Sequence, residues 1–340
     1  MIVVTGGAGF IGSALISKLN SRGVTDILVV DELSRDELSQ TGNSDSGFGE
    51  KWKNLQNLSF SDYIEKDNFL EMVLKGEVQP TVEAVLHMGA CSDTTETDAS
   101  YLNKNNYEYT RHLAKWTTDS GIRFIYASSA ATYGDGSAGF RDDEEKINEL
   151  KPLNLYGNSK QLFDLWARKT GLLEKIVGLK YFNIYGPNEY HKGHMRSFVV
   201  KAYEQISDKG GVSLFKSYKS EYKDGEQQRD FLYIKDAVDM TLFFLDNPKT
   251  AGLFNIGSGK SRTWNDLVKA VFAAMNKEPN IEYIEMPDSI RNQYQYFTQA
   301  DISKLRKAGC DREITQLEDA VKDYVQNYLQ KGGYLIKLRC

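Results

Sequence analysis

Short runs of apolar residues recur along the first half of the chain and are separated by segments of mixed polarity. The runs cover residues 2–5, 27–31, 84–88, 124–127 and 176–182. After the first run, apolar residues return every three or four positions, as they do on one face of a helix. Short apolar strands that alternate with helices are typical of a parallel sheet covered on both faces. The pattern therefore predicts an α/β protein with a doubly wound parallel sheet.

The pattern becomes less regular after about residue 183. Strand-like segments at 213–215 and 231–234 are mixed with amphipathic helical segments at 235–245, 264–275 and 316–329. We therefore expect a smaller C-terminal lobe and one return of the chain to the sheet. The predicted division assigns residues 1–182, with a return segment near 230–258, to a Rossmann-type dinucleotide-binding domain, and residues 183–229 and 259–330 to a substrate-binding lobe.

A glycine-rich segment follows the first apolar run. Gly6, Gly9 and Gly12 have the spacing G-x-x-G-x-x-G, and Gly7 begins the overlapping pattern G-x-G-x-x-G. Glycines at this spacing allow a tight turn, a close approach of the backbone to a pyrophosphate and close helix packing. The helix expected to begin near Phe10 would point its positive end at the phosphates. The segment predicts a dinucleotide-binding site.

The residues expected near the adenosine end of the cofactor differ in whether they favour NAD or NADP. Asp31 ends the second apolar run, where it can accept a hydrogen bond from the adenosine ribose. Taken alone it favours NAD, because its charge would repel the 2′-phosphate of NADP. Lys51 and Lys66 could neutralise that phosphate, although each can equally be a solvated surface lysine. These residues leave the choice between NAD and NADP open.

A tyrosine and a lysine four positions apart form a candidate proton-transfer pair. Tyr156 and Lys160 would lie on one face of a helix. A phenol with a pKa of about 10 is a poor base at neutral pH, but a neighbouring ammonium and the charge of a nicotinamide would lower that pKa. Ser129 follows the fourth apolar run and would hydrogen-bond the same substrate oxygen at the carboxyl edge of the sheet. The three residues predict proton transfer coupled to hydride transfer.

Together these motifs resemble the extended short-chain dehydrogenase/reductase family. The similar segments are the glycine loop at 5–12, the Tyr-Ala-Ser-Ser run at 126–129, the Tyr-x-x-x-Lys motif at 156–160, and residues 181–187 and 229–231. The resemblance implies a Rossmann-type fold and an enzyme that uses NAD or NADP to oxidise, epimerise or dehydrate a nucleotide-activated sugar.

The residues around the motifs distinguish between these reactions. Dehydratases of the family have an Asp-Glu pair after the active-site Ser or Thr, whereas Ala130 and Ala131 follow Ser129 here. An epimerase must deliver hydride to either face of a transient ketone, and two acid/base groups serve the two hydroxyl positions better than one. Lys192 is the candidate for the second group, with a phosphate clamp as its alternative role. These residues disfavour dehydration and are compatible with epimerisation.

Narrower motifs are similar to those of the heptose 6-epimerases within this family. They include His-Lys-Gly at 191–193, Gly-Ala-Cys-Ser at 89–92 and the run at 294–301. This likeness implies interconversion of ADP-D-glycero- and ADP-L-glycero-D-manno-heptose at C6″, a tightly bound NADP, with NAD as the alternative, and a homo-oligomer that is a pentamer in the family. Another nucleotide-sugar epimerase, such as a UDP-hexose 4-epimerase, is the alternative, against which the His-Lys-Gly motif counts.

The resemblance also implies a role for individual residues. Lys201 stands where a substrate-contacting histidine is usual, and Lys216 replaces a more common acid. The implied catalytic residues are Tyr156, Lys192, Lys160 and Ser129. The implied cofactor contacts are Gly6, Gly9, Phe10, Ile11, Gly12, Asp31, Glu32, Lys51, Lys66, Met88, Gly89, Ala90, Cys91, Ser92, Asn105, Lys160 and Ile184. The implied substrate contacts are Asn183, His194, Lys201, Phe215, Arg229 and Tyr294.

Composition narrows the class of protein further. The net charge of −5 counts against a nucleic-acid partner, and no apolar stretch has the eighteen or so residues of a membrane helix. Three cysteines, an odd number and far apart, favour a reducing compartment, so we expect a cytoplasmic protein. His191 and His194 have no nearby Cys or carboxylate set, so no metal site is expected. Residues 34–49, rich in Ser, Asp, Gly and Asn, predict a mobile surface loop.

Overall fold

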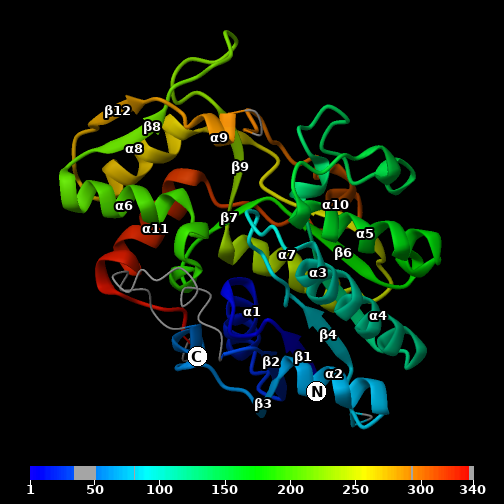
Figure 1. Ribbon diagram of the computed structural model, residues 1–340. Helices are drawn as coiled ribbons and strands as arrows, with labels where there is room; N and C mark the ends of the chain where they lie inside the picture. The colour runs from blue at the N-terminus through cyan, green and yellow to red at the C-terminus, as the bar shows by residue number, and fades with distance from the viewer. Residues whose placement is uncertain (34–50, 80, 292–293, 337–340) are drawn as a thin grey trace.

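The computed structural model describes residues 1–33, 51–79, 81–291 and 294–336. Its centre is a sheet of seven strands, all pairing in parallel (Figure 1). The strand order across the sheet reverses between β1 and β4, which is the switch point of a doubly wound fold. The predicted fold class is therefore confirmed. In order across the sheet, the strands are β10 (Gly252–Ile256), β6 (Val177–Tyr181), β5 (Arg123–Ser129), β4 (Ala84–His87), β1 (Ile2–Thr5), β2 (Ile27–Asp31) and β3 (Asp62–Glu65).

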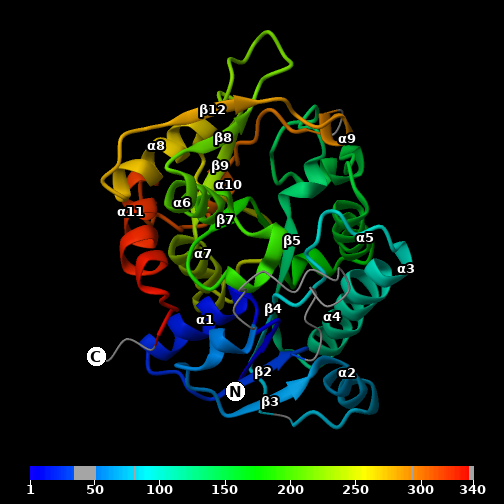
Figure 2. The same ribbon diagram turned by 60° about the vertical axis from the view of Figure 1, so that its left-hand side comes forward.

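Helices cover both faces of this sheet (Figures 1 and 2). Alternate strand residues enter two separate cores, because successive side chains of a strand point to opposite faces. Val4 and Val29 pack in one core with α1 (Phe10–Ser21) and α7 (Ile234–Asp246). Val3 packs in the other, which the remaining helices of the sheet domain cover. These helices are α2 (Lys66–Lys75), α4 (Tyr109–Asp119) and α5 (Leu155–Lys169).

The expected secondary structure after residue 183 is present with shifted ends. The predicted strand at 231–234 begins earlier, since β9 pairs with β7 on one side and with β11 on the other. The predicted helix at 264–275 begins at Trp264 because Thr263 and Asp266 form a capping box. The strands are β7 (Asn183–Tyr185), β8 (Val212–Phe215), β9 (Gln228–Tyr233), β11 (Ser261–Thr263) and β12 (Ile281–Ile284), and the helices are α6 (Phe198–Lys209), α8 (Trp264–Ala274), α9 (Asp288–Arg291), α10 (Ser303–Lys307) and α11 (Leu317–Asn327).

Short helical segments complete the described chain. A π-helical turn, η2 (Asn103–Glu108), joins α3 (Ala99–Leu102) to α4. The 3-10 turns are η1 (Lys51–Leu55), η3 (Ala130–Tyr133), η4 (Glu144–Glu149), η5 (Leu172–Glu174), η6 (Tyr190–Met195) and η7 (Leu329–Lys331).

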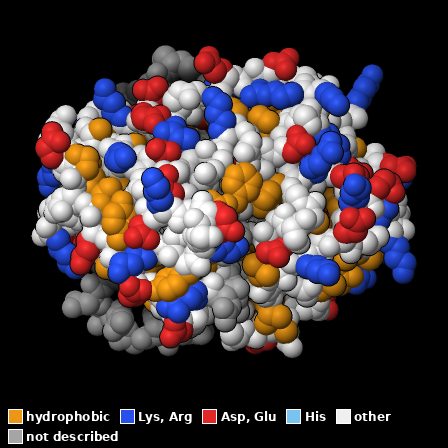
Figure 3. All heavy atoms as spheres, turned by 90° about the horizontal axis from the view of Figure 1, so that it is seen from above, with side chains coloured by type: hydrophobic (Ala, Val, Ile, Leu, Met, Phe, Trp, Pro, Cys, Tyr) orange, Lys and Arg blue, Asp and Glu red, His pale blue; other side chains and the backbone are white. Residues whose placement is uncertain are grey.

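The loop predicted at 34–49 lies outside the described residues. Within the described part of the chain, no helix is both long and apolar enough to cross a membrane. On the face seen in Figure 3, basic and acidic side chains are interspersed with small apolar areas.

Candidate active site

The glycine loop between β1 and α1 has the conformation that a dinucleotide site needs. Gly6 has a φ of +64°, and a Cβ at this position would come within 2.6 Å of the backbone nitrogen of Gly89. A Cβ at Gly12 would collide with the carbonyl oxygen of Gly6. A Cβ at Gly7 would instead meet the side chain of Val29 and the backbone of β1, away from the loop cavity. Of the four glycines, Gly6, Gly9 and Gly12 line the cavity beside the loop, and Gly7 does not.

The N-terminus of α1 opens into a cavity. Gly9 caps the helix without a side-chain hydrogen bond, and the first turn contains no acid. Backbone N–H groups and the positive end of the helix thus face the space where a pyrophosphate would lie. This cavity is a fit for a dinucleotide, because it also extends to Asp31 and Lys66, at the ends of β2 and β3.

Most residues implied as cofactor contacts line this cavity; Lys160 and Ile184 do not. Lys192, implied as catalytic, lines it as well. The sequence did not single out the remaining residues of the lining as cofactor contacts, although Thr5 and His191 belong to the quoted motifs. These residues are Thr5, Val30, Asp93, Tyr101, Tyr109, His191 and Met195.

Two acids and two lysines are interleaved at the expected adenosine end. The carboxylate of Asp31 accepts hydrogen bonds from the backbone nitrogens of Ala8 and Glu32, each at 2.7 Å. Lys51 Nζ lies 2.5 Å from Oδ1 of Asp31, and Lys66 Nζ lies 2.8 Å from Oε2 of Glu32. The two lysines, which were expected to neutralise a 2′-phosphate, are therefore paired with Asp31 and Glu32 in the protein by itself.

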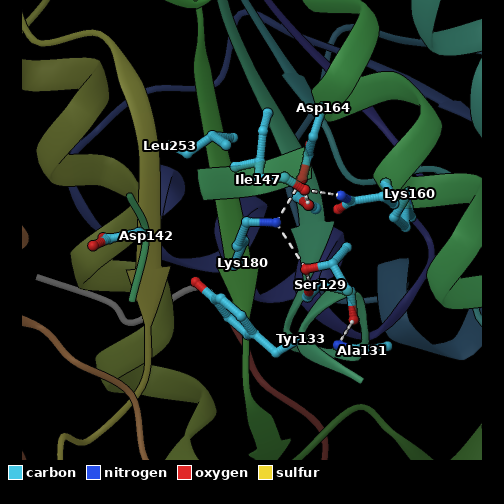
Figure 4. Close-up of polar contacts among 12 residues, drawn as sticks. Ser129, Ala131, Tyr133, Asp142, Ile147, Lys160, Asp164, Lys180 and Leu253 are labelled. Carbon is cyan, nitrogen blue, oxygen red and sulfur yellow. Dashed lines mark hydrogen bonds and ion pairs between the residues drawn. The ribbon is translucent and has the colours of Figure 1, made fainter. Parts of the chain in front are cut away.

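Ser129, Tyr156 and Lys160 meet at the carboxyl end of β5. Helix α5 begins at Leu155 because the side chain of Asn154 accepts a hydrogen bond from the backbone of Gly157, at 2.7 Å. This start places Tyr156 in the first turn, where its hydroxyl hydrogen-bonds Ser129. Lys160, one turn later, donates to the carbonyl of Ala127, 2.9 Å away. Figure 4 shows the side chains of Lys160 and Ser129.

Burial dominates the titration of this pair. It raises the pKa of Tyr156 above its ordinary value, and the hydrogen bond with Ser129 opposes that shift. It lowers the pKa of Lys160 to about 8, and the carboxylate of Asp164 opposes that shift. In the protein without cofactor, burial therefore outweighs any lowering of the Tyr156 pKa by the ammonium of Lys160, which donates to the Ala127 carbonyl.

The turn η6 places Lys192 against the glycine loop. Its ammonium lies over the ring of Phe10, 5.4 Å from the centroid, at the N-terminus of α1. His194, mostly exposed, lies 3.5 Å from the carboxylate of Asp93, and Lys201 donates to the His194 carbonyl at 2.7 Å. His194 and Lys201 are thus brought together beside the loop that follows β4.

A buried guanidinium lies on β9, outside the seven-stranded sheet. Arg229 on β9 is 7% exposed and is stacked between Trp264 and Tyr294, at 5.7 and 5.2 Å from their ring centroids. Phe215 contacts the ring of Tyr294, so three implied substrate residues gather here from separate segments. Among the described residues, no carboxylate forms an ion pair with Arg229, and burial lowers its pKa. Asn183, on the neighbouring strand β7, is exposed and lies opposite Phe231 in the sheet.

One further lysine does not take part in this cluster. Lys216 forms an ion pair with Glu285 at 2.7 Å, and both side chains are exposed. The structure therefore gives Lys216 a surface partner rather than a place beside Arg229.

Asn106 is a site residue that the sequence analysis missed. It is 1% exposed and hydrogen-bonds both the backbone nitrogen and the carbonyl of Cys91, at 2.8 and 3.0 Å. It also donates to Ser159 Oγ on α5, at 2.9 Å. Asn106 thus joins the cavity loop to the helix of Tyr156. The adjacent asparagines at 105 and 106 were the signal in the sequence, but only Asn105 was predicted as a cofactor contact.

His87 is buried under the cavity and predicts a loss of stability in acid. The hydroxyl of Thr110 donates to the Asn106 carbonyl, so Nε2 of His87 donates to Thr110 at 2.9 Å, and Nδ1 accepts from Thr5 at 2.6 Å. Burial lowers the pKa of His87 to about 3. Between about pH 6.5 and 3 the unfolded chain therefore binds a proton that the folded protein does not, and the free energy of unfolding falls by up to about 1.4 kcal/mol per pH unit.

Urea unfolding between pH 4 and 6.5 measures this slope. The variant His87→Gln keeps a hydrogen-bond donor and an acceptor. Its free energy of unfolding should change less steeply with pH, by the equivalent of about one bound proton. His191, whose pKa burial also lowers to about 3, should keep its own contribution in that variant. An unchanged slope in His87→Gln would contradict the assignment.

Within the described ranges, no three His, Cys, Asp or Glu side chains are grouped as metal ligands. His191 instead hydrogen-bonds the side chain of Asn54, at 3.2 Å.

Comparisons with known proteins identify the family of the chain. A model of the NAD dependent epimerase/dehydratase family matches residues 2–257. A protein of Nitratidesulfovibrio vulgaris (strain DP4), named ADP-L-glycero-D-manno-heptose-6-epimerase, is 55% identical over 329 residues, 97% of this chain and 98% of that protein. The crystal structure of the Helicobacter pylori ADP-L-glycero-D-manno-heptose-6-epimerase has a TM-score of 0.78 at 27% identity, covering 96% of this chain and 95% of that one. UDP-glucose 4-epimerase of Thermotoga maritima, solved with UDP-glucose, has a TM-score of 0.73 at 26% identity, covering 97% and 99%. The chain therefore belongs to the NAD dependent epimerase/dehydratase family.

Proposed function

We propose that this protein interconverts ADP-D-glycero-D-manno-heptose and ADP-L-glycero-D-manno-heptose by way of a transient ketone at C6″. The observation that carries the chemistry is the joint placement of Ser129, Tyr156 and Lys160 at the sheet edge and of Lys192 in the dinucleotide cavity. Cys91 lines the same cavity and influences the titration of Tyr156 and Lys160, which supports one continuous site. The identity with the heptose epimerase of Nitratidesulfovibrio supports the substrate.

The proposed substrate spans the two parts of the molecule. Arg229 is a buried cation without an acidic partner among the described residues, and a planar guanidinium matches the oxygens of a diphosphate. Phe215 and Tyr294 provide aromatic surface beside it for the rest of the nucleotide. With the diphosphate held here, the sugar extends toward the end of β5, where Tyr156 lies.

The catalytic residues then divide the proton transfers between them. A bound nicotinamide supplies the acceptor and donor of hydride. Tyr156 takes the proton of one C6″ hydroxyl while Ser129 holds the oxygen, and the ammonium of Lys160 stabilises the phenolate. Lys192 serves the hydroxyl of the other epimer, which points away from Tyr156. Because the hydride returns to the same carbon, the enzyme needs no external oxidant.

We propose NADP as the cofactor. Lys51 and Lys66 line the cavity beside Asp31 and Glu32, and such a mixed set suits a ribose that carries a 2′-phosphate. Asp31 is already satisfied by Ala8 and by Lys51, which reduces its repulsion of a phosphate. A cytoplasmic location and a homo-oligomeric state, pentameric as in the family, complete the proposal.

The purified protein tests this function directly. It should invert C6″ of ADP-D-glycero-D-manno-heptose without added cofactor, as followed by NMR of the product. Denaturation of the same sample should release NADP(H), identified by chromatography. Conversion of UDP-galactose without conversion of the heptose would contradict the proposal and favour the 4-epimerase alternative.

Replacing Arg229 should weaken substrate binding more than catalysis. The variant Arg229→Gln should raise KM about 10- to 100-fold with kcat changed little, because a hydrogen-bonded charge contributes about 1.5–3 kcal/mol to binding. Arg262 is the matched control: it pairs with Arg229 across β11 and β9, but its side chain forms ion pairs with Asp266 and Glu318. Equal effects of Arg229→Gln and Arg262→Gln on KM would argue against a diphosphate ligand.

A further inference from the structure

A buried ion pair lies directly behind the candidate catalytic residues. Lys180 Nζ on β6 is 2.6 Å from Oδ2 of Asp164 on α5, and both side chains are fully buried. The proposed proton transfers use neither group. A buried ion pair is often no more stabilising than an apolar pair of the same size. Stability alone therefore gives no reason for placing two charges here.

The carboxylate of Asp164 joins α5 to β5. Its Oδ1 accepts from the hydroxyl of Tyr126, at 2.9 Å, and its Oδ2 accepts from Ser128 Oγ, at 2.7 Å. Ser128 immediately precedes Ser129 at the end of the strand. Asp164 thus ties the strand that ends in Ser129 to the helix that holds Tyr156 and Lys160.

The ammonium of Lys180 extends the same connection to the turn after β5. It donates to Thr132 Oγ1 at 2.7 Å, and the hydroxyl of Thr132 donates to the carbonyl of Ser129 at 2.8 Å. Figure 4 shows Lys180 reaching from its strand toward Asp164, with Lys160 on the other side of that carboxylate. One pair of charges therefore links β5 and α5, from which Ser129, Tyr156 and Lys160 project, to the turn that follows β5.

The pair also has an electrostatic relation to Lys160. Asp164 follows Lys160 by one helical turn, and its carboxylate favours the charged amine, whereas burial lowers the pKa of that amine to about 8. The other groups that face Lys160 are the thiol of Cys91, the neutral ring of His87 and the carbonyl of Ala127. Among these groups, Asp164 is the one carboxylate.

We infer that Asp164 and Lys180 are positioning residues, which hold the end of β5 against α5 and keep Lys160 in its charged form so that Tyr156 can ionise. The inference rests on the proposed function, since it assigns the pair to the Tyr156 proton transfer. It explains why a charge pair stands where apolar residues would pack equally well.

A charge-free double variant separates this role from a structural one. Asp164→Asn or Lys180→Met alone leaves one buried charge without a partner, so each should unfold at a lower temperature. Asp164→Asn combined with Lys180→Met removes both charges, keeps an acceptor for the buried hydroxyls of Tyr126 and Ser128, and should recover most of the melting temperature. In this double variant the ionisation midpoint of Tyr156 should rise by about one pH unit, and kcat at pH 7 should fall about tenfold with KM changed less than twofold.

The ionisation of Tyr156 is measured on the cofactor-bound protein by NMR of 13C-labelled tyrosine, with Tyr156→Phe identifying the resonance. This readout needs no sugar substrate. If the wild-type protein does not convert ADP-heptose, the proposed function fails while the NMR result still tests the pair. A folded double variant with a normal Tyr156 midpoint and normal kcat overturns the inference.

Two further variants complete the test. Thr132→Val keeps the ion pair but removes its hydrogen-bonded link to Ser129, so kcat should fall several-fold with KM unchanged. If the double variant does not fold, Thr132→Val is the test of the positioning role, and an unchanged kcat in it would overturn the inference. Asp239→Asn is the matched control, because that carboxylate is buried on α7 and bound by Lys18 at 2.8 Å and Arg312 at 2.6 Å. It should leave the Tyr156 midpoint unchanged, and an equal shift there would also overturn the inference.

Discussion

Replacing Tyr156 by phenylalanine should lower kcat for epimerisation by about 10²- to 10⁴-fold, the range expected when a positioned acid/base group is lost. The phenol is the group at the end of β5 that hydrogen-bonds Ser129, and burial raises its pKa in the protein alone. Ionisation of Tyr156 therefore depends on the ammonium of Lys160 and on the nicotinamide charge. Because the ring itself is retained, binding of cofactor and KM should change little.

The measurement is a steady-state rate on ADP-heptose, together with the amount of nucleotide that co-purifies. Tyr203→Phe, on α6, removes a hydroxyl from a partly buried tyrosine outside the site and should have no effect on the rate. A Tyr156→Phe variant with more than a tenth of the wild-type rate would show that another group transfers the proton.

Replacing Lys192 by alanine should reduce epimerisation by a similar factor while leaving the cofactor bound. The reason is that the two epimers present their C6″ hydroxyls in different directions, so Tyr156 can serve only one of them. Lys192 lines the dinucleotide cavity together with Cys91, whose thiol affects the titration of Tyr156. Half-reactions measured separately from each epimer should show that the loss is larger for one of them.

The position of Lys192 over Phe10 gives this experiment a second possible outcome. An ammonium at the N-terminus of α1 would also suit a phosphate of the cofactor. A clamp of that kind predicts nucleotide loss on purification of Lys192→Ala, with the rate restored by added NADP. Lys260 is an exposed lysine, and the variant Lys260→Ala is the control for a general effect of lost positive charge on nucleotide binding.

Local sequence patterns predicted the fold class and part of the candidate site, because strands, turns and single helices depend mainly on residues close together in the chain. The five apolar runs predicted strands, and each became a strand of the central sheet, although β3 and β10 were not singled out. β3 was missed because its burial is only partial and its sequence, Asp-Tyr-Ile-Glu, has acids at both ends. The spacing of Tyr156 and Lys160 likewise needs only the geometry of one helix.

Other features could not be read from the chain because they depend on distant segments. Lys180 sits in an apolar run, and nothing in that run indicates that Asp164, on another element, completes an ion pair with it. The gathering of Phe215, Arg229 and Tyr294 also requires three separate segments to meet.

The sequence by itself determined the alternation of strands and helices, the dinucleotide loop and the Tyr156–Lys160 pair, since each depends on spacings within a single strand, turn or helix. Only the tertiary structure decided that Gly6 rather than Gly7 faces the cavity, because that arrangement depends on the approach of Gly89 from the loop after β4. It also decided the direction in which the pKa of Tyr156 shifts. Desolvation depends on everything that packs around a group, and no spacing along the chain contains that information.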